Sequence, residues 1–303
     1  MLLVKKSETQ HSALSTQNSL LAKEALREAV LRLQSAKIES ASLDARIIME
    51  QVLGVTREQL LFSLDLPIND AQYAELKKLV EMREMRKPLA QIIGKREFWG
   101  LNFVVSDATL DPRPDSETLV EAVLARLQNR SAKLRILDLG TGTGCLLLSL
   151  LSELPNANGV AVDICENALN IARQNALNLG ISGRVQFICS NWAEKLKDIE
   201  EKFDIIISNP PYIPSEEIKT LAPEVAKFEP IGALDGGIDG FDCYRKIIGQ
   251  LPKLLTENGF TAFEIGMGQE KYLAEIADNN GFEVIEIKKD LAGIARCVIL
   301  KNE

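Results

Sequence analysis

Four consecutive residues near the middle of the chain, Asn209, Pro210, Pro211 and Tyr212, are suited to hold a planar amino group. The side-chain oxygen of Asn209 and the backbone oxygen of Pro210 are both hydrogen-bond acceptors. The two prolines fix φ and disfavour helical geometry before them, so both oxygens keep a defined direction. Tyr212 adds a flat surface for the conjugated group that carries the –NH2. We predict that all four residues bind the substrate and that Asn209, Pro210 and Tyr212 are catalytic.

The chemistry that such a clamp serves is methyl transfer to nitrogen. An amide or aryl amine nitrogen is a poor nucleophile because its lone pair is delocalised. Hydrogen bonds that fix its N–H groups let the nitrogen become pyramidal towards an electrophilic methyl group, and the in-line displacement then depends on positioning and electrostatics. No histidine is needed. His11 is the only histidine, and the five cysteines contain no C-x-x-C pair, so we predict no catalytic triad and no metal site.

A second chemical feature is the segment RILDLGTGTGCLLLSLL, which is predicted to form a strand, a glycine loop and a helix. Glycines let the backbone turn sharply and let a ligand lie against bare main chain. The G-x-G-x-G spacing differs from the G-x-G-x-x-G of dinucleotide-binding proteins, and a tight turn without a ligand is the alternative. Asp163 ends the next predicted strand, 23 residues after Gly140. A carboxylate at this edge of the sheet can accept both ribose hydroxyls of an adenosine group.

These features indicate a nucleoside cofactor without phosphates. S-adenosylmethionine fits, since its sulfonium cation also suits an acidic cleft. Trp192 follows the third predicted strand, where its indole is placed to pack on an adenine; packing in the core is the alternative. Asn209 reaches the same edge of the sheet. The predicted cofactor-binding residues are Gly140, Thr141, Gly142, Thr143, Gly144, Asp163, Trp192 and Asn209.

The elements that must position these residues begin with a helical domain. Residues 1–17 are rich in Ser, Thr and Gln without periodicity, which predicts a disordered leader. Apolar residues at helical spacing predict a compact helical domain over 18–88, and Pro88 ends its last helix. Aromatic and β-branched residues around Gly100 predict a β-hairpin linker over 89–110.

Residues 111–303 are predicted to form the catalytic domain. Strand and helix patterns alternate, which predicts an α/β fold with a mostly parallel, doubly wound sheet. The last two strands are joined only by LAG, so we expect an antiparallel pair at the edge of the sheet. The predicted strands are 135–140, 159–163, 184–189, 203–208, 259–266, 281–290 and 295–301, and the main helices between them are 144–154, 166–179, 240–256 and 268–280.

Charge separates the two domains. Residues 1–90 hold 13 Lys and Arg against 12 Asp and Glu, whereas the remainder holds 22 against 31. Modules that follow a phosphate backbone present basic surfaces, so extended nucleic-acid binding by the acidic catalytic domain is disfavoured. No window approaches the roughly 18 apolar residues of a spanning helix. We therefore expect a cytoplasmic monomer without membrane contact.

From about Ser19 onwards the chain resembles the protein-(glutamine N5) methyltransferases that modify peptide chain release factors. NPPY alone is shared with adenine-N6 methyltransferases and specifies only the reaction type. The combination is more specific, because PRPDSETLVE precedes the glycine loop and EIKTLAPEV follows NPPYIP. The segments that carry the resemblance are REFWGLNF, LDPRPDSETLVE, LDLGTGTG, NPPYIP, ALDGGIDGFDCYR and EIGMGQ.

The resemblance implies a class I methyltransferase fold with a seven-stranded sheet and S-adenosylmethionine as cofactor. It implies that residues 209–212 hold the glutamine of the Gly-Gly-Gln motif of class-I release factors, and that the helical domain over 18–88 helps to dock the release factor. Asn191 departs from the family, in which Asp is common; its amide can still accept a hydrogen bond from adenine, but the carboxylate is lost. Adenine-N6 methylation and a binding module without activity are the alternatives. Three further residues either line the site or form structural ion pairs, namely Arg113, Glu117 and Glu264.

Overall fold

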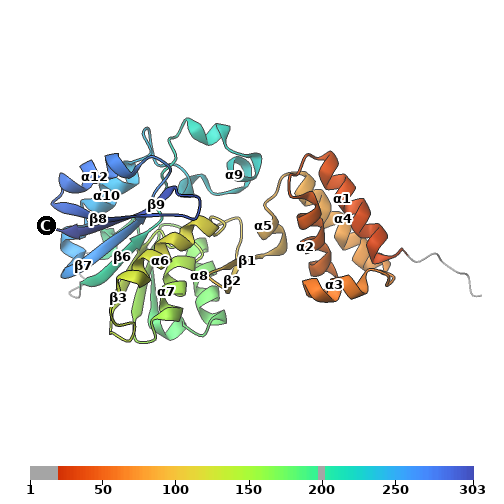
Figure 1. Ribbon diagram of the computed structural model, residues 1–303, viewed down its shortest axis with the longest axis horizontal. Helices are drawn as coiled ribbons and strands as arrows, with labels where there is room; N and C mark the ends of the chain where they lie inside the picture. The colour runs from red at the N-terminus through yellow and green to blue at the C-terminus, as the bar shows by residue number, and fades with distance from the viewer. Residues whose placement is uncertain (1–19, 197–201) are drawn as a thin grey trace, which may run out of the picture. The chain divides into compact units, whose positions relative to one another are not determined.

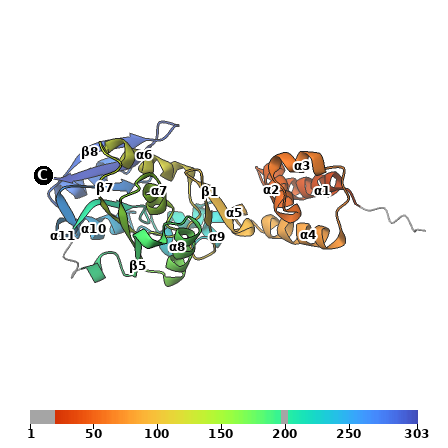
Figure 2. The ribbon, with the colours of Figure 1, turned by 90° about the horizontal axis from the view of Figure 1, so that it is seen from below.

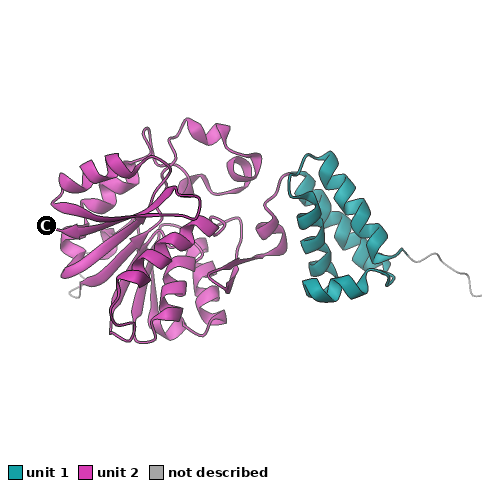
Figure 3. Ribbon diagram, viewed as in Figure 1, with its two compact units in different colours: residues 1–85 teal, residues 86–303 magenta. Residues whose placement is uncertain are grey.

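A computed structural model describes residues 20–196 and 202–303. The chain divides into two compact units, Met1–Met85 and Arg86–Glu303 (Figure 3). The disordered leader expected over residues 1–17 lies outside the described residues. Within the described ranges, every helix is too short or too polar to cross a membrane.

The first unit is a bundle of helices whose apolar faces meet. Its elements are α1 (Ala22–Ser35), α2 (Ala41–Leu53), α3 (Arg57–Ser63) and α4 (Asp70–Glu84). Thr56 and Asn69 cap α3 and α4, each accepting a hydrogen bond from a backbone N–H in the first helical turn. Asp44 of α2 accepts a buried hydrogen bond of 2.7 Å from Arg83 of α4. The bundle is therefore held by an apolar core, together with the helix caps and the buried ion pair. The core includes Ala25, Leu33, Ile48, Leu76 and Val80.

The second unit begins with a short helix before its hairpin. Residues Leu89–Ile93 form α5, and only then do β1 (Lys95–Phe98) and β2 (Leu101–Val104) pair as an antiparallel hairpin. The prediction of a hairpin linker from residue 89 is therefore wrong at its start. Pro88 is the N-cap of α5, where its missing backbone N–H costs no hydrogen bond within the helix. Gly94 ends the helix in the left-handed conformation at φ 76°.

In the part of the chain that the structure describes, seven strands form one sheet in the order β5-β4-β3-β6-β7-β9-β8. Strand β9 runs antiparallel to both β7 and β8, and the other neighbours are parallel. This confirms the predicted mostly parallel sheet with an antiparallel pair at its edge. The strands are β3 (Arg135–Leu139), β4 (Asn158–Asp163), β5 (Val185–Cys189), β6 (Phe203–Ser208), β7 (Leu255–Glu264), β8 (Phe282–Lys289) and β9 (Ala295–Asn302).

Helices cover both faces of this sheet (Figures 1 and 2). On one face lie α6 (Glu117–Arg126), α7 (Cys145–Glu153) and α8 (Glu166–Asn178), and on the other lie α10 (Asp242–Ile248), α11 (Leu251–Leu254) and α12 (Glu270–Asp278). Side chains alternate along β3: Leu137 and Leu139 join the core under α10 to α12, whereas Ile136 joins the core under α6 to α8. Two apolar cores thus hold the carboxyl ends of the strands at one edge.

One predicted helix is broken in the structure. The segment 240–256 was expected to be continuous, but α10 ends at Ile248, Pro252 opens the short α11, and β7 already begins at Leu255. Pro252 lacks a backbone N–H and is tolerated only in a first helical turn, which forces a new start. The remaining short elements are η1 (Pro114–Ser116), η2 (Ser182–Arg184), η3 (Glu194–Leu196), η4 (Glu217–Thr220), α9 (Pro223–Phe228) and η5 (Ile231–Ala233).

Candidate active site

The glycine loop joins β3 to α7 in a conformation that requires glycine. Gly140, Gly142 and Gly144 all have positive φ, at 78°, 53° and 81°. A Cβ at Gly144 would lie 3.1 Å from the Cδ1 of Leu148, so a larger residue would also crowd α7. The N–H groups of Gly140 and Thr141 both donate to the Val162 carbonyl at 2.9 Å. The loop is therefore anchored to the neighbouring strand β4.

Asp163 ends β4 and holds the same loop through its side chain. Its Oδ2 accepts the Gly142 N–H at 2.8 Å, and its Oδ1 accepts the Cys165 N–H at 2.9 Å. Burial raises the pKa of Asp163, and these backbone hydrogen bonds oppose the rise. A carboxylate oxygen has more than one acceptor direction, so both oxygens can still accept hydroxyl groups of a ligand.

A second carboxyl, Asp138, lies beneath the loop, and sequence reasoning did not single it out. The Thr141 hydroxyl donates to its Oδ2 at 2.6 Å. Its Oδ1 is buried without a hydrogen-bond partner. Burial raises the pKa of Asp138 to about 7. Its position two residues before Gly140, between the apolar residues Leu137 and Leu139, is the sequence signal that could have marked it.

Asn175, also not anticipated, connects the hairpin to the loop. It is fully buried in α8. Its Nδ2 donates to the carbonyls of Thr143 at 2.9 Å and Val104 at 3.0 Å, and its Oδ1 accepts the Val104 N–H at 2.7 Å. Because the buried amide makes all three bonds, β2 and the glycine loop are held to one helix.

Trp192 and Asn191 follow β5 and line the same cavity as the loop. The indole Cζ3 of Trp192 lies 3.4 Å from where a Cβ of Gly140 would be, which is an ordinary van der Waals distance. Trp192 also packs against the apolar core, which is one of the two alternatives for this residue, and packing on an adenine stays a prediction. The Asn191 Nδ2 donates to Glu194 Oε1 at 2.7 Å, which leaves the Asn191 oxygen as the acceptor.

The NPPY residues follow β6 at the same edge. Asn209 is half-buried, and its Nδ2 lies 3.5 Å from the Ser116 hydroxyl oxygen. Pro210 is buried, whereas Pro211 and Tyr212 are partly exposed. Burial raises the pKa of Tyr212 to about 12, so its hydroxyl is neutral at physiological pH. Tyr212 thus presents an uncharged ring.

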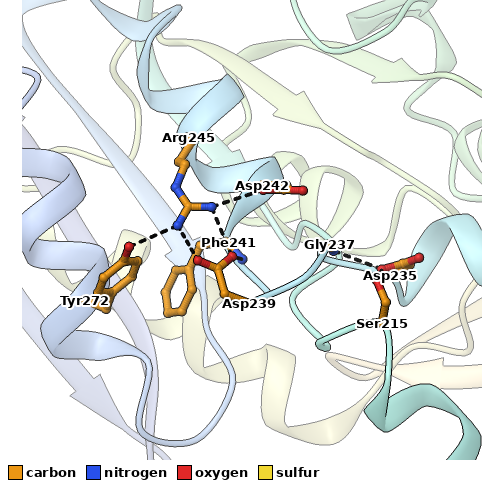
Figure 4. Close-up of polar contacts among 8 residues, drawn as sticks. All are labelled: Ser215, Asp235, Gly237, Asp239, Phe241, Asp242, Arg245 and Tyr272. Atoms are coloured by element: carbon orange, nitrogen blue, oxygen red, sulfur yellow. Dashed lines mark hydrogen bonds and ion pairs between the residues drawn. The ribbon is translucent and has the colours of Figure 1, made fainter.

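A glycine-rich segment, residues 235–240, packs directly against this backbone. The Gly236 N–H donates to the Ile213 carbonyl at 2.8 Å. A Cβ at Gly240 would lie 2.5 Å from the Tyr212 carbonyl oxygen, so the close approach needs glycine. Asp235 accepts hydrogen bonds from the Ser215 hydroxyl at 2.6 Å and from a backbone N–H in the same segment at 2.9 Å (Figure 4).

The end of this segment is held by Arg245 of α10 (Figure 4). The guanidinium forms an ion pair with Asp239 and a second one with Asp242 at 3.0 Å. It also donates to the Tyr272 hydroxyl of α12 at 3.1 Å. The segment ALDGGIDGFDCYR therefore has a structural role, because it supports the backbone of the residues that follow Asn209.

The glycine loop and the NPPY segment enclose one cavity of about 360 Å³. This is the volume range of small-molecule sites. Among the described residues, Gly144, Pro210 and Tyr212 do not line it, although they adjoin residues that do. The predicted site residues that line it are Gly140, Thr141, Gly142, Thr143, Asp163, Trp192, Asn209 and Pro211.

The three residues left open by the sequence have different surroundings. Arg113 lines the cavity and forms an ion pair with the buried Glu229. Glu117 is structural, because it accepts the Trp99 N–H at 2.8 Å in the hairpin turn. Glu264 is buried next to Asn209.

Asp111 is a further cavity residue that sequence reasoning missed. It is buried, and its Oδ1 has no hydrogen-bond partner. Burial raises its pKa, while Arg96 and Arg113 oppose the rise. A buried carboxylate oxygen without a partner is expensive. The cavity wall therefore fits a ligand with a positive charge or a hydrogen-bond donor at this point.

Comparison with known proteins gives a consistent family. Residues 24–94 match the PrmC N-terminal domain, and residues 130–292 match a methyltransferase domain. The chain is 43% identical to the release factor glutamine methyltransferase of Rhodospirillum rubrum over 89% of its length and 82% of that protein. It is 42% identical to the protein of the same name from Bradyrhizobium diazoefficiens, over 90% of this chain and 92% of the relative.

A solved structure supports the fold independently. The 16S rRNA N2 G1207 methyltransferase of T. thermophilus, in complex with AdoMet and guanosine, superposes with a TM-score of 0.50 at 18% identity. The match covers 69% of this chain and 50% of that one. At this identity it shows the fold alone, which is the predicted class I methyltransferase fold. The sequence relatives establish that the chain belongs to the release factor glutamine methyltransferase family.

Proposed function

We propose that this protein transfers a methyl group from S-adenosylmethionine to the side-chain amide nitrogen, N5, of the glutamine in the Gly-Gly-Gln motif of class-I release factors. This reaction supports translation termination in the cytoplasm. One observation carries the proposal: Asn209 of the NPPY segment and the glycine loop with Asp163 line a single cavity. An amide-holding group and a nucleoside-holding group are thus brought to the same place.

The residues present fit S-adenosylmethionine. When bound, this cofactor supplies a methyl group activated by a positively charged sulfur. Bare backbone at Gly140 and Gly142 admits a close ligand, and the unpartnered Asp111 Oδ1 offers an acceptor for a cationic group. Asp163 accepts the ribose hydroxyls, and Trp192 packs on the adenine. The Asn191 oxygen accepts from the adenine amine, since its nitrogen is engaged by Glu194.

The substrate amide is held by the NPPY segment. Asn209 Oδ1 and the Pro210 carbonyl accept hydrogen bonds from the two N–H groups of the glutamine –NH2. These hydrogen bonds orient the nitrogen lone pair. Pro211 and the Tyr212 ring bound the flat amide. Pro210 and Tyr212 lie outside the cavity lining, which fits a substrate subsite beside the cofactor. The acceptors are preorganised, so no rearrangement is needed at the moment of transfer.

The decisive experiment uses labelled S-adenosylmethionine and a release factor with its Gly-Gly-Gln motif intact or changed to Gly-Gly-Ala. We expect label only in the intact protein, on the peptide that contains the motif. Equal labelling of the two proteins would contradict the proposal. A parallel reaction with duplex DNA at moderate salt tests the adenine-N6 alternative, for which methylated adenine is the positive result.

A further inference from the structure

Strand β7 ends in a buried carboxyl that the proposed function does not yet use. Glu264 begins the segment EIGMGQ and follows Phe263 of β7, which pairs with Ser208 of β6, the residue before Asn209. The side chains of Ser116 and Asn209 interact with the Glu264 carboxyl and lower its pKa. Its Oε2 is buried without a hydrogen-bond partner. Burying an acidic group costs free energy of desolvation unless the group is paired or hydrogen-bonded.

The hydrogen bonds among these three side chains have a defined direction. Asn209 Nδ2 donates to the Ser116 hydroxyl oxygen at 3.5 Å. The Ser116 hydroxyl hydrogen is then free to donate to Glu264. An ionised carboxylate only accepts hydrogen bonds, so both neighbours must turn donors towards it. An Asn209 amide whose nitrogen donates to these groups has its oxygen on the opposite side of the side chain.

Asn209 Oδ1 is useful only in this orientation. An amide turned over by half a rotation would present its –NH2 to the substrate –NH2, and two donors repel each other. The two orientations have almost the same shape, so packing alone selects weakly between them. A buried acceptor behind the amide nitrogen favours the orientation in which the –NH2 group faces it, because the alternative places the amide oxygen against the acceptor. The low polarity of the surroundings strengthens this electrostatic preference.

We propose that Glu264 is a positioning residue that, as a carboxylate, holds the Asn209 amide with its oxygen towards the substrate nitrogen. This inference rests on the proposed function, in which Asn209 Oδ1 accepts a hydrogen bond from the substrate. Ser116 of η1 accepts a hydrogen bond from Asn209 Nδ2 and so favours the same orientation of the amide. Glu264 itself does not line the cavity, so it acts through Asn209.

Protonation would remove this control. Burial raises the pKa of Glu264 to about 7, whereas hydrogen bonds from Ser116 and Asn209 and the charge of Arg296 oppose the rise. Asp115, which pairs with Arg296 at 2.8 Å, raises it further. A protonated Glu264 carries a hydrogen that can be donated to the Asn209 oxygen, which permits the inverted amide. Activity should therefore fall as the pH drops through about 7.

The kinetic test compares Glu264→Leu and Glu264→Gln with the matched control Glu286→Gln, which alters a carboxylate paired on the surface with Arg126 at 2.9 Å. We expect kcat to fall on the order of 100-fold for Leu and about tenfold for Gln, which keeps an acceptor oxygen. Cofactor Kd should stay within about twofold by calorimetry. Wild-type kcat should fall on the acid side of about pH 7, and Glu264→Gln should lose this dependence.

A readout that needs no substrate follows the Asn209 side-chain –NH2 by NMR in protein labelled with ¹⁵N-asparagine. Asn209→Ala identifies the signals by their loss. We expect the wild-type signals to titrate near pH 7 and those of Glu264→Gln not to titrate. Because Asp138 has a similar pKa of about 7, Asp138→Asn should leave this titration in place.

The two readouts separate the two proposals. Titration of the Asn209 amide through Glu264, without methyl transfer to any release factor, would leave the positioning role intact and overturn the proposed substrate. Methyl transfer by Glu264→Gln at the wild-type kcat and pH profile, with Asn209 signals that titrate as before, would overturn the positioning role. Thermal unfolding of Glu264→Gln and Glu286→Gln checks that both variants are folded.

Discussion

The two sides of the cavity are held in place in different ways. The loop side, residues 140–144 with Asp163, is secured by adjacent strands of one β-α-β unit: Gly140 and Thr141 donate to Val162, and Asp163 accepts from Gly142. These partners lie within about one strand-helix repeat, and a more distant contact is the hydrogen bond from Asn175 of α8 to the Thr143 carbonyl. This side is therefore a local structure, which the glycine spacing and the next acidic residue almost specify.

The NPPY side, residues 209–212, depends on segments that are far apart in the chain. Ser116 and Glu264 reach Asn209, while the Gln269 Nε2 donates to the Tyr212 carbonyl at 2.9 Å. Residues 236–240 pack against the same backbone. Three separate parts of the second unit, namely Ser116, residues 264–269 and residues 236–240, must therefore fold before these acceptors have a fixed direction. Cofactor binding and methyl transfer should respond to different mutations for this reason.

Asn209→Ala is expected to have the largest effect. Methyl transfer should fall on the order of 1,000-fold, because an acceptor that orients the nucleophile is lost. Cofactor Kd should change only a few-fold, since the loop side keeps its contacts. Single-turnover assays and calorimetry measure the two quantities, with the exposed Asn102→Ala as control. A loss of cofactor binding as large as the loss of transfer would show that the two sides are not separable.

Gly240→Ala tests the remote support of the NPPY side. The new Cβ would lie 2.5 Å from the Tyr212 oxygen at a residue with φ 82°, so Tyr212 must shift. A displacement of this kind should reduce transfer about 100-fold with little change in cofactor Kd. Gly281→Ala is the matched control, because φ is 76° there and no atom lies within 4 Å of the added Cβ. Similar losses of transfer in the two variants would show that backbone strain alone causes the loss, and not a displacement of Tyr212.

Asp163→Asn should give the smallest change and the opposite signature. A single amide oxygen cannot accept from Gly142, from Cys165 and from a ribose together, so cofactor Kd should rise about tenfold. At saturating cofactor, kcat should remain within about threefold. Asp278→Asn on the exposed side of α12 is the control. Unchanged cofactor affinity with a collapsed kcat would reverse the roles that we assign to the two sides.

Much of the fold follows from local patterns. Apolar strands separated by helices predict the parallel sheet, and the short LAG connection predicts the antiparallel edge, both of which the structure confirms. The errors occur where a few residues compete between structures. Leu89–Ile93 is apolar enough for a strand, but Pro88 and Gly94 favour one helical turn. The segment 240–256 has helical periodicity, but Pro252 starts a new element.

The chain by itself determines the conformations that neighbouring residues impose. Glycines permit the positive φ angles of residues 140–144, and prolines restrict residues 209–211, because these effects act within a few bonds. Only the tertiary structure decides which polar groups are buried together. In the sequence, Glu264 is open between a site residue and an ion-pair residue, and neither Asp111 nor Asp138 is singled out. The packed sheet removes them from water and raises the pKa of each, because desolvation depends on all the segments around a group and not on its neighbours in the chain.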